Sequence, residues 1–448
     1  MSAIDGLTAR LLQVLALRCD DLPADVRRVA RDCLADWLAC TWAGVSEPVS
    51  GIVAAAAGEE GGHPQASFIG RAGKGTVLQA ALVNGTASHA LDYDDVHLAV
   101  PGHMSAAIVP GLLALAEQQG SSGAEFIAAF VAGYEVACRV GKLVEPAHYA
   151  NGFHATATIG SLGAAVACAH LLRLPPEQAA HAVGLAATQA AGLKAMFGTM
   201  AKPLHAGLAS RAGLQSVLLA RKGLTTRVDA LECVQGFAQV HGSDFHTADA
   251  LAEPAGGYHL LANLFKFHAA CYSTHSTIES VAALRQEHTL EADDVASIRV
   301  VAGEGCTICN IQEPVTALEA KFSLRIAAAF ALLGVETSRV SEWARATEPD
   351  VRAVRDRVVV ELVPGMGLSD STVTLRLRDG TELSRSHDCG APMADKEKQS
   401  TRVLAKLAAL AAPARGGPPP PRLLELLSTV DRQKDLRELV ALCRAEAD

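Results

Sequence analysis

The amino-acid sequence predicts a mainly α-helical protein that carries an inserted α+β domain. Apolar residues recur at spacings of three and four from residue 5 to about 222, and the same helical pattern returns from about residue 396. Between these parts, alternating β-branched residues indicate strands. Half of the 448 residues are hydrophobic and only 4% are aromatic, which favours tightly packed helices with small residues at their contacts.

Local signals mark the ends of several helices in the first half of the chain. The stretch "LPPEQAAHAVGLAATQAAG" (174–192) opens with prolines, which suit the first turn of a helix. The stretch "HAGLASRAGLQSVLLARKG" (205–223) ends on glycine and carries Arg and Lys in its last turn, as helix C-termini prefer. The Gly/Thr/Ser-rich stretch 155–172 is the nearest approach to a membrane span, and we interpret it as an internal helix in close contact with others.

The inserted part shows strand patterns at 295–303, 355–363 and 371–386, and the last contains Asp379-Gly380, a hairpin turn signal. A helix is expected over 317–335. Near the C-terminus, 414–423 is proline-rich and predicts a stiff exposed loop, with two short helices after it. The expected domains are therefore an all-helical domain formed by 1–265 and 396–448, and an α+β domain formed by 266–395.

The overall charge excludes some classes of partner. A net charge of −9 and a pI near 6.0 argue against nucleic acid and against an anionic membrane surface as binding partners.

No signal peptide is recognised, because no basic region precedes the first short apolar run. The eleven cysteines are scattered and odd in number, which fits a reduced, cytoplasmic protein without disulfides. The single CxxC pair, Cys306 and Cys309, is weak evidence for a metal site because no second pair accompanies it.

The segment 89–103 concentrates polar side chains that are suited to proton transfer. It contains His89, Asp92, Asp94, Asp95, His97 and His103. If a helix ends near Asp92, His89 and Asp92 share one of its faces. Ordinary roles are also open, since Asp94 or Asp95 can cap a turn and His89 can be a satisfied core histidine. A metal site is less favoured, because the spacing matches no standard ligand motif.

Three further stretches carry candidate functional residues. His154 precedes a predicted helix whose N-terminus would suit a carboxylate, although an ordinary capping role is open. Lys202, in "GTMAKPLHAGLASRAG" with His205, can hold a substrate carboxylate or can extend to solvent from a helix start. The stretch 265–280 at the expected domain junction supplies Lys266, Cys271 and His275. Cys271 is a possible nucleophile, but a structural role is the simpler interpretation.

No nucleotide or phosphate motif accompanies these residues. The chain has no GxGxxG after a strand, no GxxxxGK[ST] and no GxSxG. Acids, histidines and lysines without a recognisable cofactor motif favour acid–base chemistry on a carbon acid, in which a base removes a proton next to a carboxylate while cations stabilise the developing charge.

Together these stretches resemble the MmgE/PrpD family. The resemblance rests on five stretches, which occur in the family's order: "VNGTASHALDYDDVH", "GFHATATIGSLGAA", "GTMAKPLHAGLASRAG", "FKFHAACYSTH" and "EAKFSL". The resemblance covers the chain from about residue 5 to 440. It implies an all-helical domain made from both chain ends, an α+β lid, and a pocket for a small polycarboxylate between them. It also implies a homodimer without a cofactor.

The resemblance also nominates the site residues. As catalytic groups it implies Asp92, His103, His154, Lys202 and Lys266; as substrate-binding groups it implies His205, Cys271 and His275; it implies no metal ligands. Asp92 and His103 are the expected proton-handling pair. The two lysines are expected to clamp carboxylates, and His154 is expected to act as the acid.

The reaction expected first is that of a hydro-lyase of the 2-methylcitrate dehydratase type. An epimerase or isomerase of an iminodisuccinate-like acid is an alternative, and so is a non-catalytic, acid-binding homodimer. A metal-dependent hydro-lyase would need a stoichiometric ion. A cis-aconitate-type decarboxylase is a further alternative that departures from that pattern disfavour: Val96 replaces a threonine, Cys271 replaces a histidine, and no tyrosine follows Tyr272.

Overall fold

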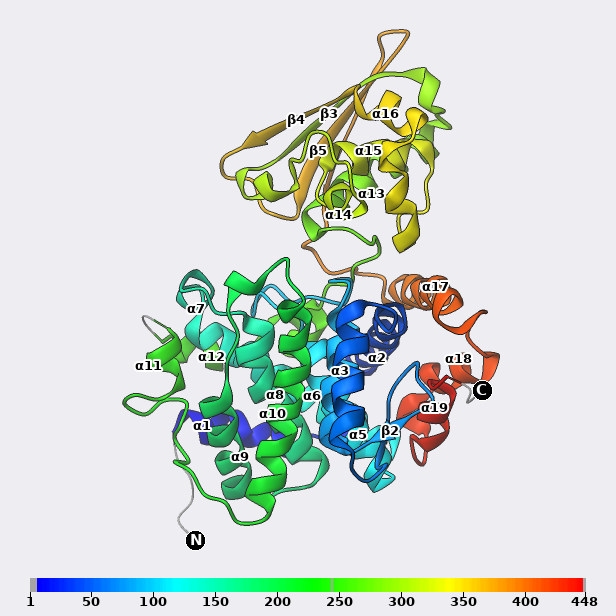
Figure 1. Ribbon diagram of the computed structural model, residues 1–448. Coiled ribbons are helices and arrows are strands. Elements are labelled where there is room, and N and C mark those ends of the chain that lie inside the picture. The colour runs from blue at the N-terminus through cyan, green and yellow to red at the C-terminus, as the bar shows by residue number, and fades with distance from the viewer. Residues whose placement is uncertain (1–5, 243–244, 446–448) are drawn as a thin grey trace. The chain divides into compact units, whose positions relative to one another are not determined.

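The computed structural model describes residues 6–242 and 245–445, except the side chains of 412–414. The chain forms two compact units. The first combines the residues up to Phe265 with those from Met393 onward, and the second is Lys266–Pro392. Helices make up the first unit, and helices on a sheet make up the second (Figure 1). The predicted fold class, mainly α with an α+β portion, is confirmed.

The first unit is built from long helices and a few short ones. The long helices are α2 (Ala24–Gly44), α3 (Pro48–Glu60), α4 (Val77–His89), α5 (Met104–Gln119), α6 (Gly123–Val144), α8 (Ala155–Leu171), α9 (Pro176–Gln189), α10 (Ala201–Arg221) and α17 (Lys396–Arg415). The shorter elements are α1 (Leu7–Leu11), α7 (Ala147–Ala150), α11 (Phe237–His241), α12 (Thr247–Leu251), α18 (Pro421–Ser428), α19 (Arg437–Leu442) and the two-residue strands β1 (Ala66–Ser67) and β2 (Lys74–Gly75). The proline pair predicted to start a helix does so, with Pro176 in the first turn of α9.

The core of this unit is α8, which packs against α5, α6, α9 and α10. Nearly every residue of α8 is buried, and small residues let its neighbours approach closely. A Cβ on Gly133 of α6 would lie 2.4 Å from the carbonyl oxygen of Gly163. Within the described part of the chain, no helix has the length and apolar character needed to cross a membrane. The apolar stretch 155–172 is thus an internal helix, as its small residues indicate.

A second close approach sets the geometry between α4 and α10. A Cβ on Gly85 would lie 2.7 Å from Cα of Gly207, and a Cβ on Gly207 would lie 2.3 Å from the carbonyl oxygen of Leu82. Only glycine permits such backbone contact. The crossing brings the C-terminal end of α4 near the N-terminal end of α10, so that His89 and Lys202 belong to one region of the unit.

The two distant chain segments of this unit meet where α17 packs on α2 (Figure 1). Lys406 of α17 donates to Asp36 of α2 over 2.7 Å, and both side chains are essentially inaccessible to solvent. Lys406 also donates to the carbonyl oxygen of Tyr93 over 2.7 Å and lies 4.0 Å from the centre of the Tyr93 ring. A buried ammonium is stable only when it is paired and hydrogen-bonded, and here three groups satisfy it.

The second unit is a four-stranded sheet covered on one face by helices. The strands are β3 (Val295–Gly303), β4 (Val358–Val363), β5 (Asp370–Leu377) and β6 (Glu382–Asp388), in the order β4-β3-β5-β6. β3 and β4 are parallel, and the other neighbours are antiparallel. Helices α13 (His275–His288) and α15 (Leu324–Leu333) pack on the sheet, and the short α14 (Ala317–Ala320) and α16 (Pro349–Arg355) complete the unit.

Sequence patterning explains the two faces of this sheet. Val300 and Val373 point to the helices and are fully buried, whereas Thr372 and Ser386 form a hydrogen-bonded pair on the solvent face. The predicted hairpin is present, with Gly380 at φ +90° in the turn between β5 and β6. The helix predicted over 317–335 is two helices, because the Ser323 hydroxyl accepts from the backbone N–H of Ile326 and starts α15 there.

The buried Lys406–Asp36 pair makes a stability prediction. Lys406→Met should lower the free energy of unfolding by about 3–5 kcal/mol, because it leaves Asp36 as an uncompensated buried carboxylate. The double variant Lys406→Met with Asp36→Asn should recover part of this loss, since Asn retains a side-chain oxygen for the backbone N–H of Asp95. Urea unfolding of the single variants and the double variant measures the coupling; additive effects would contradict a direct pair.

Candidate active site

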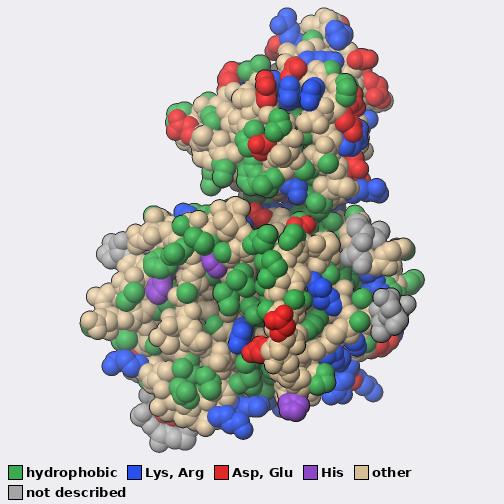
Figure 2. All heavy atoms as spheres, viewed as in Figure 1, with side chains coloured by type: hydrophobic (Ala, Val, Ile, Leu, Met, Phe, Trp, Pro, Cys, Tyr) green, Lys and Arg blue, Asp and Glu red, His purple; other side chains and the backbone are tan. Residues whose placement is uncertain are grey.

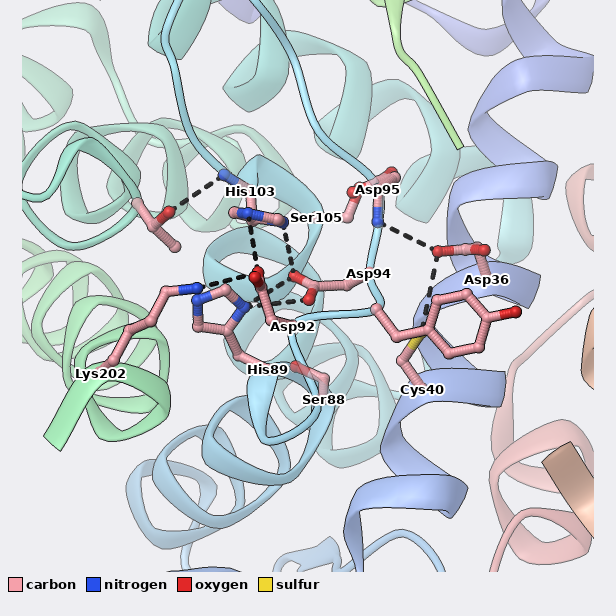
Figure 3. Close-up of polar contacts among 12 residues, drawn as sticks. Asp36, Cys40, Ser88, His89, Asp92, Asp94, Asp95, His103, Ser105 and Lys202 are labelled. Carbon is pink, nitrogen blue, oxygen red and sulfur yellow. Dashed lines mark hydrogen bonds and ion pairs between the residues drawn. The ribbon is translucent and has the colours of Figure 1, made fainter. Parts of the chain in front are cut away.

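The polar segment after α4 turns sharply instead of continuing as helix. Helix α4 ends at His89 and not near Asp92, so the expectation that His89 and Asp92 share a helical face is wrong. Asp92 adopts a left-handed backbone with φ +52°, a conformation that Asp tolerates better than most residues. Asp94 and Asp95, which follow this turn, are directed into the unit and are buried (Figure 3).

Asp94 holds two imidazoles at once. Nδ1 of His89 lies 3.0 Å from both carboxylate oxygens of Asp94, and Nδ1 of His103 lies 3.2 Å from Oδ2 (Figure 3). Burial alone would raise the pKa of Asp94, but the two neighbouring imidazoles outweigh it and hold that pKa well below its usual range. Asp94 is therefore a fixed anion, and it fixes the orientation of both rings instead of capping a turn.

His89 is buried and neutral. Burial lowers its pKa to about 4, although Asp94 acts in the opposite direction. Because its Nδ1–H donates to Asp94, its Nε2 carries a lone pair, and this buried atom has no hydrogen-bond partner among the described residues. The ring lies 4.7 Å from that of His103 and 5.9 Å from that of His154, centre to centre. His89 is thus not a satisfied core histidine.

Asp92, His103 and Lys202 form the exposed side of the cluster. Nζ of Lys202 lies 2.8 Å from Oδ1 of Asp92, and Nε2 of His103 lies 3.3 Å from the same oxygen. Both ring nitrogens of His103 therefore face a carboxylate. The side chain of Asp92 is 40% exposed, while those of His103 and Lys202 are 11% and 15% exposed. Asp92 is thus the most exposed of the three side chains.

His154 and His205 form a second imidazole pair. His154 is the residue before α8, and its side chain makes no capping hydrogen bond. Its Nδ1 lies 3.0 Å from Nδ1 of His205, so one of these nitrogens donates and the other accepts. Burial first, and then the surrounding histidines and Lys202, lower the pKa of His154, and burial and Lys202 lower that of His205. Both rings are held neutral.

The other polar residues of the segment have structural roles. His97 donates from Nε2 to the carbonyl oxygen of His259 over 2.9 Å and accepts from the backbone N–H of Ala99 at Nδ1. Asp95 accepts from Ser105 over 2.6 Å and from Asn263 over 3.0 Å. Burial and the nearby Asp36 carboxylate raise the pKa of Asp95. These contacts tie the segment to the helices around it.

The remaining three nominated residues lie in the second unit. Lys266 and His275 are buried there, and Cys271 is half-buried. Nε2 of His275 donates to the carbonyl oxygen of Ala270 over 3.3 Å, and the ring packs on His268 at 4.9 Å. Burial, with His268 and Lys266, holds the pKa of His275 well below its usual range. Lys266, Cys271 and His275 thus all belong to the second unit, whereas the other nominated residues belong to the first.

Within the first unit, the five nominated residues form one continuous cluster. Asp92, His103 and Lys202 are in contact, His154 contacts His205, and His89 links the two sets. The sequence nominations missed His89 and Asp94 as site residues, although both stand in the polar segment. The sequence pattern that could have identified them is a histidine, His89, followed five residues later by Asp94, the second aspartate of "DYDD".

Two groups of side chains bring ligand atoms close enough to share a metal ion. One is His89, Asp92, Asp94 and His103, and the other is His97, Cys138 and His259. In the first group the ammonium of Lys202 already supplies a cation to Asp92. In the second group both nitrogens of His97 are engaged with the backbone, and burial holds the pKa of Cys138 well above its usual range. Members of both groups are therefore already paired with other described groups of the protein.

Comparison with known proteins gives consistent matches. The MmgE/PrpD N-terminal domain matches residues 13–248, and the MmgE/PrpD C-terminal domain matches residues 268–417. Cis-aconitate decarboxylase of Aspergillus terreus is 26% identical, over 98% of this chain and 96% of the relative. Human cis-aconitate decarboxylase is 30% identical over 69% of this chain and 67% of the relative. The cis-aconitate decarboxylase-like protein oryM of Aspergillus oryzae is 31% identical over 70% of this chain and 67% of the relative.

The charge arrangement around His89 makes a titration prediction. Histidine NMR of the ¹⁵N-labelled protein should give His89 a pKa of about 4. Asp94→Asn should lower this pKa further because it removes a stabilising anion, whereas Lys202→Met should raise it because it removes a nearby cation. A wild-type value near the ordinary 6.5, or equal shifts in both variants, would contradict the assigned surroundings.

Proposed function

Because this chain belongs to the MmgE/PrpD family of acid-processing enzymes, we propose that it is a cofactor-independent lyase of small polycarboxylic acids, and that it decarboxylates an acid of the cis-aconitate type. The relatives support decarboxylation ahead of the dehydration that the motifs alone favoured. The observation that carries the proposal is His103, whose two ring nitrogens face the carboxylates of Asp92 and Asp94.

The chemistry of such a decarboxylation needs one proton donor and a site for carboxylates. As the bond between carbon and the departing carboxylate breaks, its electron pair forms a new C=C bond. The electron pair of the original C=C bond then takes a proton at the neighbouring carbon, and CO₂ leaves. In our proposal the imidazolium of His103 gives this proton from Nε2, and Asp94 keeps Nδ1–H oriented through the transfer. Solvent returns the proton to His103 afterwards.

Lys202 and the neutral histidines complete the proposed site. The ammonium of Lys202 pairs with Asp92 and is positioned to hold a substrate carboxylate in its place. His154 was expected to be an acid; since its pKa is lowered, we assign it the role of a neutral hydrogen-bond donor to substrate oxygen. Burial lowers the pKa values of His89, His154 and His205, whereas His103 has a carboxylate beside each of its ring nitrogens.

Dehydration of a citrate-type hydroxy acid is the second candidate. The observations that favour it are Val96 and Cys271, which replace residue types expected in the decarboxylase pattern. The backbone of Val96 is fixed by paired hydrogen bonds with Leu264, and its side chain offers no hydroxyl to a substrate. The same base and clamp residues serve either reaction, so a product assay separates them.

We also propose a homodimer formed through the exposed face of α10. Leu204, Leu208 and Leu218 are spaced four and ten residues apart, which places them on one side of this helix, and each is accessible to solvent. Leu193 and Met200, just before the helix, are both 53% exposed. Hydrophobic side chains gather over this region in the space-filling view (Figure 2). An apolar patch of this kind on a protein surface marks an association site.

The experiment that tests the reaction is proton NMR in deuterated water with metal-stripped protein. The substrates are cis-aconitate, citrate, 2-methylcitrate and iminodisuccinate, each assayed alone. Carbon loss from cis-aconitate with deuterium at the protonated carbon is expected. A new alkene from citrate or 2-methylcitrate would instead show dehydration, and deuterium exchange without loss of any group would show epimerisation. Thermal stabilisation by these acids without turnover would indicate a non-catalytic binding protein.

His103 makes the sharpest mutational prediction. His103→Ala should lower kcat by about 10²–10⁴-fold, the contribution usual for one general acid, with little change in the melting temperature. His63→Ala is the matched control, because His63 is an exposed histidine outside the cluster, and it should retain full activity. Near-normal turnover of His103→Ala would remove His103 from the mechanism.

The dimer prediction uses the most exposed leucine of α10. Leu208→Glu should convert the dimer to a monomer in light scattering coupled to size exclusion, because it places a charge in an apolar contact. Val234→Glu, at an exposed apolar position away from α10, should leave the dimer intact. Dissociation by both substitutions, or by neither, would locate the interface elsewhere.

A further inference from the structure

Three cysteine thiols come together in the second unit, apart from the histidine–aspartate cluster. Cys271 immediately precedes the 3-10 helix η6 (Tyr272–Thr274), and Cys306 and Cys309 belong to the 3-10 helix η8 (Glu304–Cys309). These two short helices pack against each other. Cys309 hydrogen-bonds to Cys271, and Cys306 hydrogen-bonds to the Ser273 side chain. Two side-chain links therefore join the same pair of segments.

The backbone holds both segments in place. The N–H of Cys271 donates to the carbonyl oxygen of Lys321 over 3.0 Å, and the N–H of Asn310, next to Cys309, donates to Thr307. The thiol of Cys306 donates to the carbonyl oxygen of Leu368 over 3.5 Å. Cys306 is thus directed to Ser273 and Leu368, which leaves Cys309 as the partner of Cys271.

The two paired thiols differ in exposure and in proton affinity. Cys309 is fully buried, whereas Cys271 is half-buried and reachable by small molecules. The hydrogen bond with Cys271, and then burial, raise the pKa of Cys309, although Lys266 acts in the opposite direction. Cys309 therefore stays a thiol, hydrogen-bonded to the more accessible Cys271.

A metal site does not explain this group. In the part of the chain that the structure describes, the clusters whose ligand atoms lie close enough to share an ion do not include these three cysteines. A partly exposed thiol that is hydrogen-bonded to a second, buried thiol instead has the features of an oxidisable cysteine with its resolving partner.

We propose that Cys271 and Cys309 form an oxidation site, in which a hydroperoxide converts the two thiols to a reversible disulfide. The thiolate of Cys271 attacks one peroxide oxygen, the O–O bond breaks, and Cys271 becomes a sulfenic acid. The sulfur of Cys309 then attacks the sulfur of Cys271, the S–O bond breaks, and the oxygen leaves as water. Overall the two thiols lose two electrons and two protons, and one hydrogen peroxide becomes two molecules of water.

The consequence for activity rests on the proposed function and on the family resemblance, which implies Cys271 as a substrate-binding group. A disulfide removes its thiol from that role, so oxidation should inactivate the enzyme and a dithiol reductant should restore it. The chemical test does not depend on this consequence, because the cross-link is detected directly.

The experiment is peptide mapping of the full chain after treatment with hydrogen peroxide. Trypsin places Cys271 in the peptide 267–285 and both other cysteines in the peptide 300–321, because cleavage follows Lys266, Arg285, Arg299 and Lys321. Non-reducing mass spectrometry should show these two peptides cross-linked, and dithiothreitol should separate them. Cys306→Ser should retain the cross-link, whereas Cys309→Ser should lose it. Cys389→Ser is the matched control, since Cys389 is another half-buried cysteine of this unit.

Three outcomes would overturn the proposal. They are a cross-link that persists in Cys309→Ser, a disulfide confined to the peptide 300–321, and irreversible oxidation of Cys271 without any cross-link. Activity is measured in parallel on the substrate that the panel identifies. Reversible loss of at least tenfold in wild type but not in Cys309→Ser supports the regulatory consequence. A cross-link in a protein without turnover would keep the oxidation site and refute only the proposed function.

Discussion

The ion pair between Lys406 and Asp36 is the interaction on which the candidate site most depends. Its two residues stand 370 positions apart, and both are buried. The pair joins α17 to α2, and the second hydrogen bond of Lys406 fixes the backbone at Tyr93 while Asp36 accepts from the backbone of Asp95. The residue between these two anchors is Asp94, the anion that orients His89 and His103. A contact remote in sequence thus sets the position of the residues proposed to move a proton.

Near this ion pair, two neighbouring sets of histidines have different electrostatic surroundings. His103 lies between two carboxylates, whereas burial and Lys202 lower the pKa values of His154 and His205. The difference arises from the neighbours of each ring and not from the residue type. The close glycine contact between α4 and α10 supports this arrangement, since it brings Lys202 to Asp92. The position of the Lys202 charge in the site therefore depends on how α4 and α10 cross.

Much of the fold followed from local patterns in the sequence. The strand expected at 295–303 coincides with β3, and the proline pair and the Asp379-Gly380 turn mark the element ends they predict. Contacts between distant segments were not readable, because Lys406 shows no sign in sequence of pairing with Asp36. The sequence also did not predict the left-handed turn at Asp92. As a result, it did not show that Asp94 is buried between two imidazoles while Asp92 pairs with Lys202. The hydroxyl of Ser323 begins a new helix, α15, within a segment that apolar spacing alone predicted as one continuous helix.

The pairing of α2 with α17 also bears on how the chain matures as it is made. Synthesis runs from the N-terminus, so α2 emerges with its apolar face and the Asp36 carboxylate long before α17 exists to cover them. Meanwhile the whole of the second unit is translated, and its own sheet can form without the helical unit. Until α17 arrives, the loop carrying Asp94 lacks its anchor, and the nascent chain presents an exposed hydrophobic surface that chaperones recognise. Order of synthesis thus delays the arrangement of the candidate site until α17 has left the ribosome.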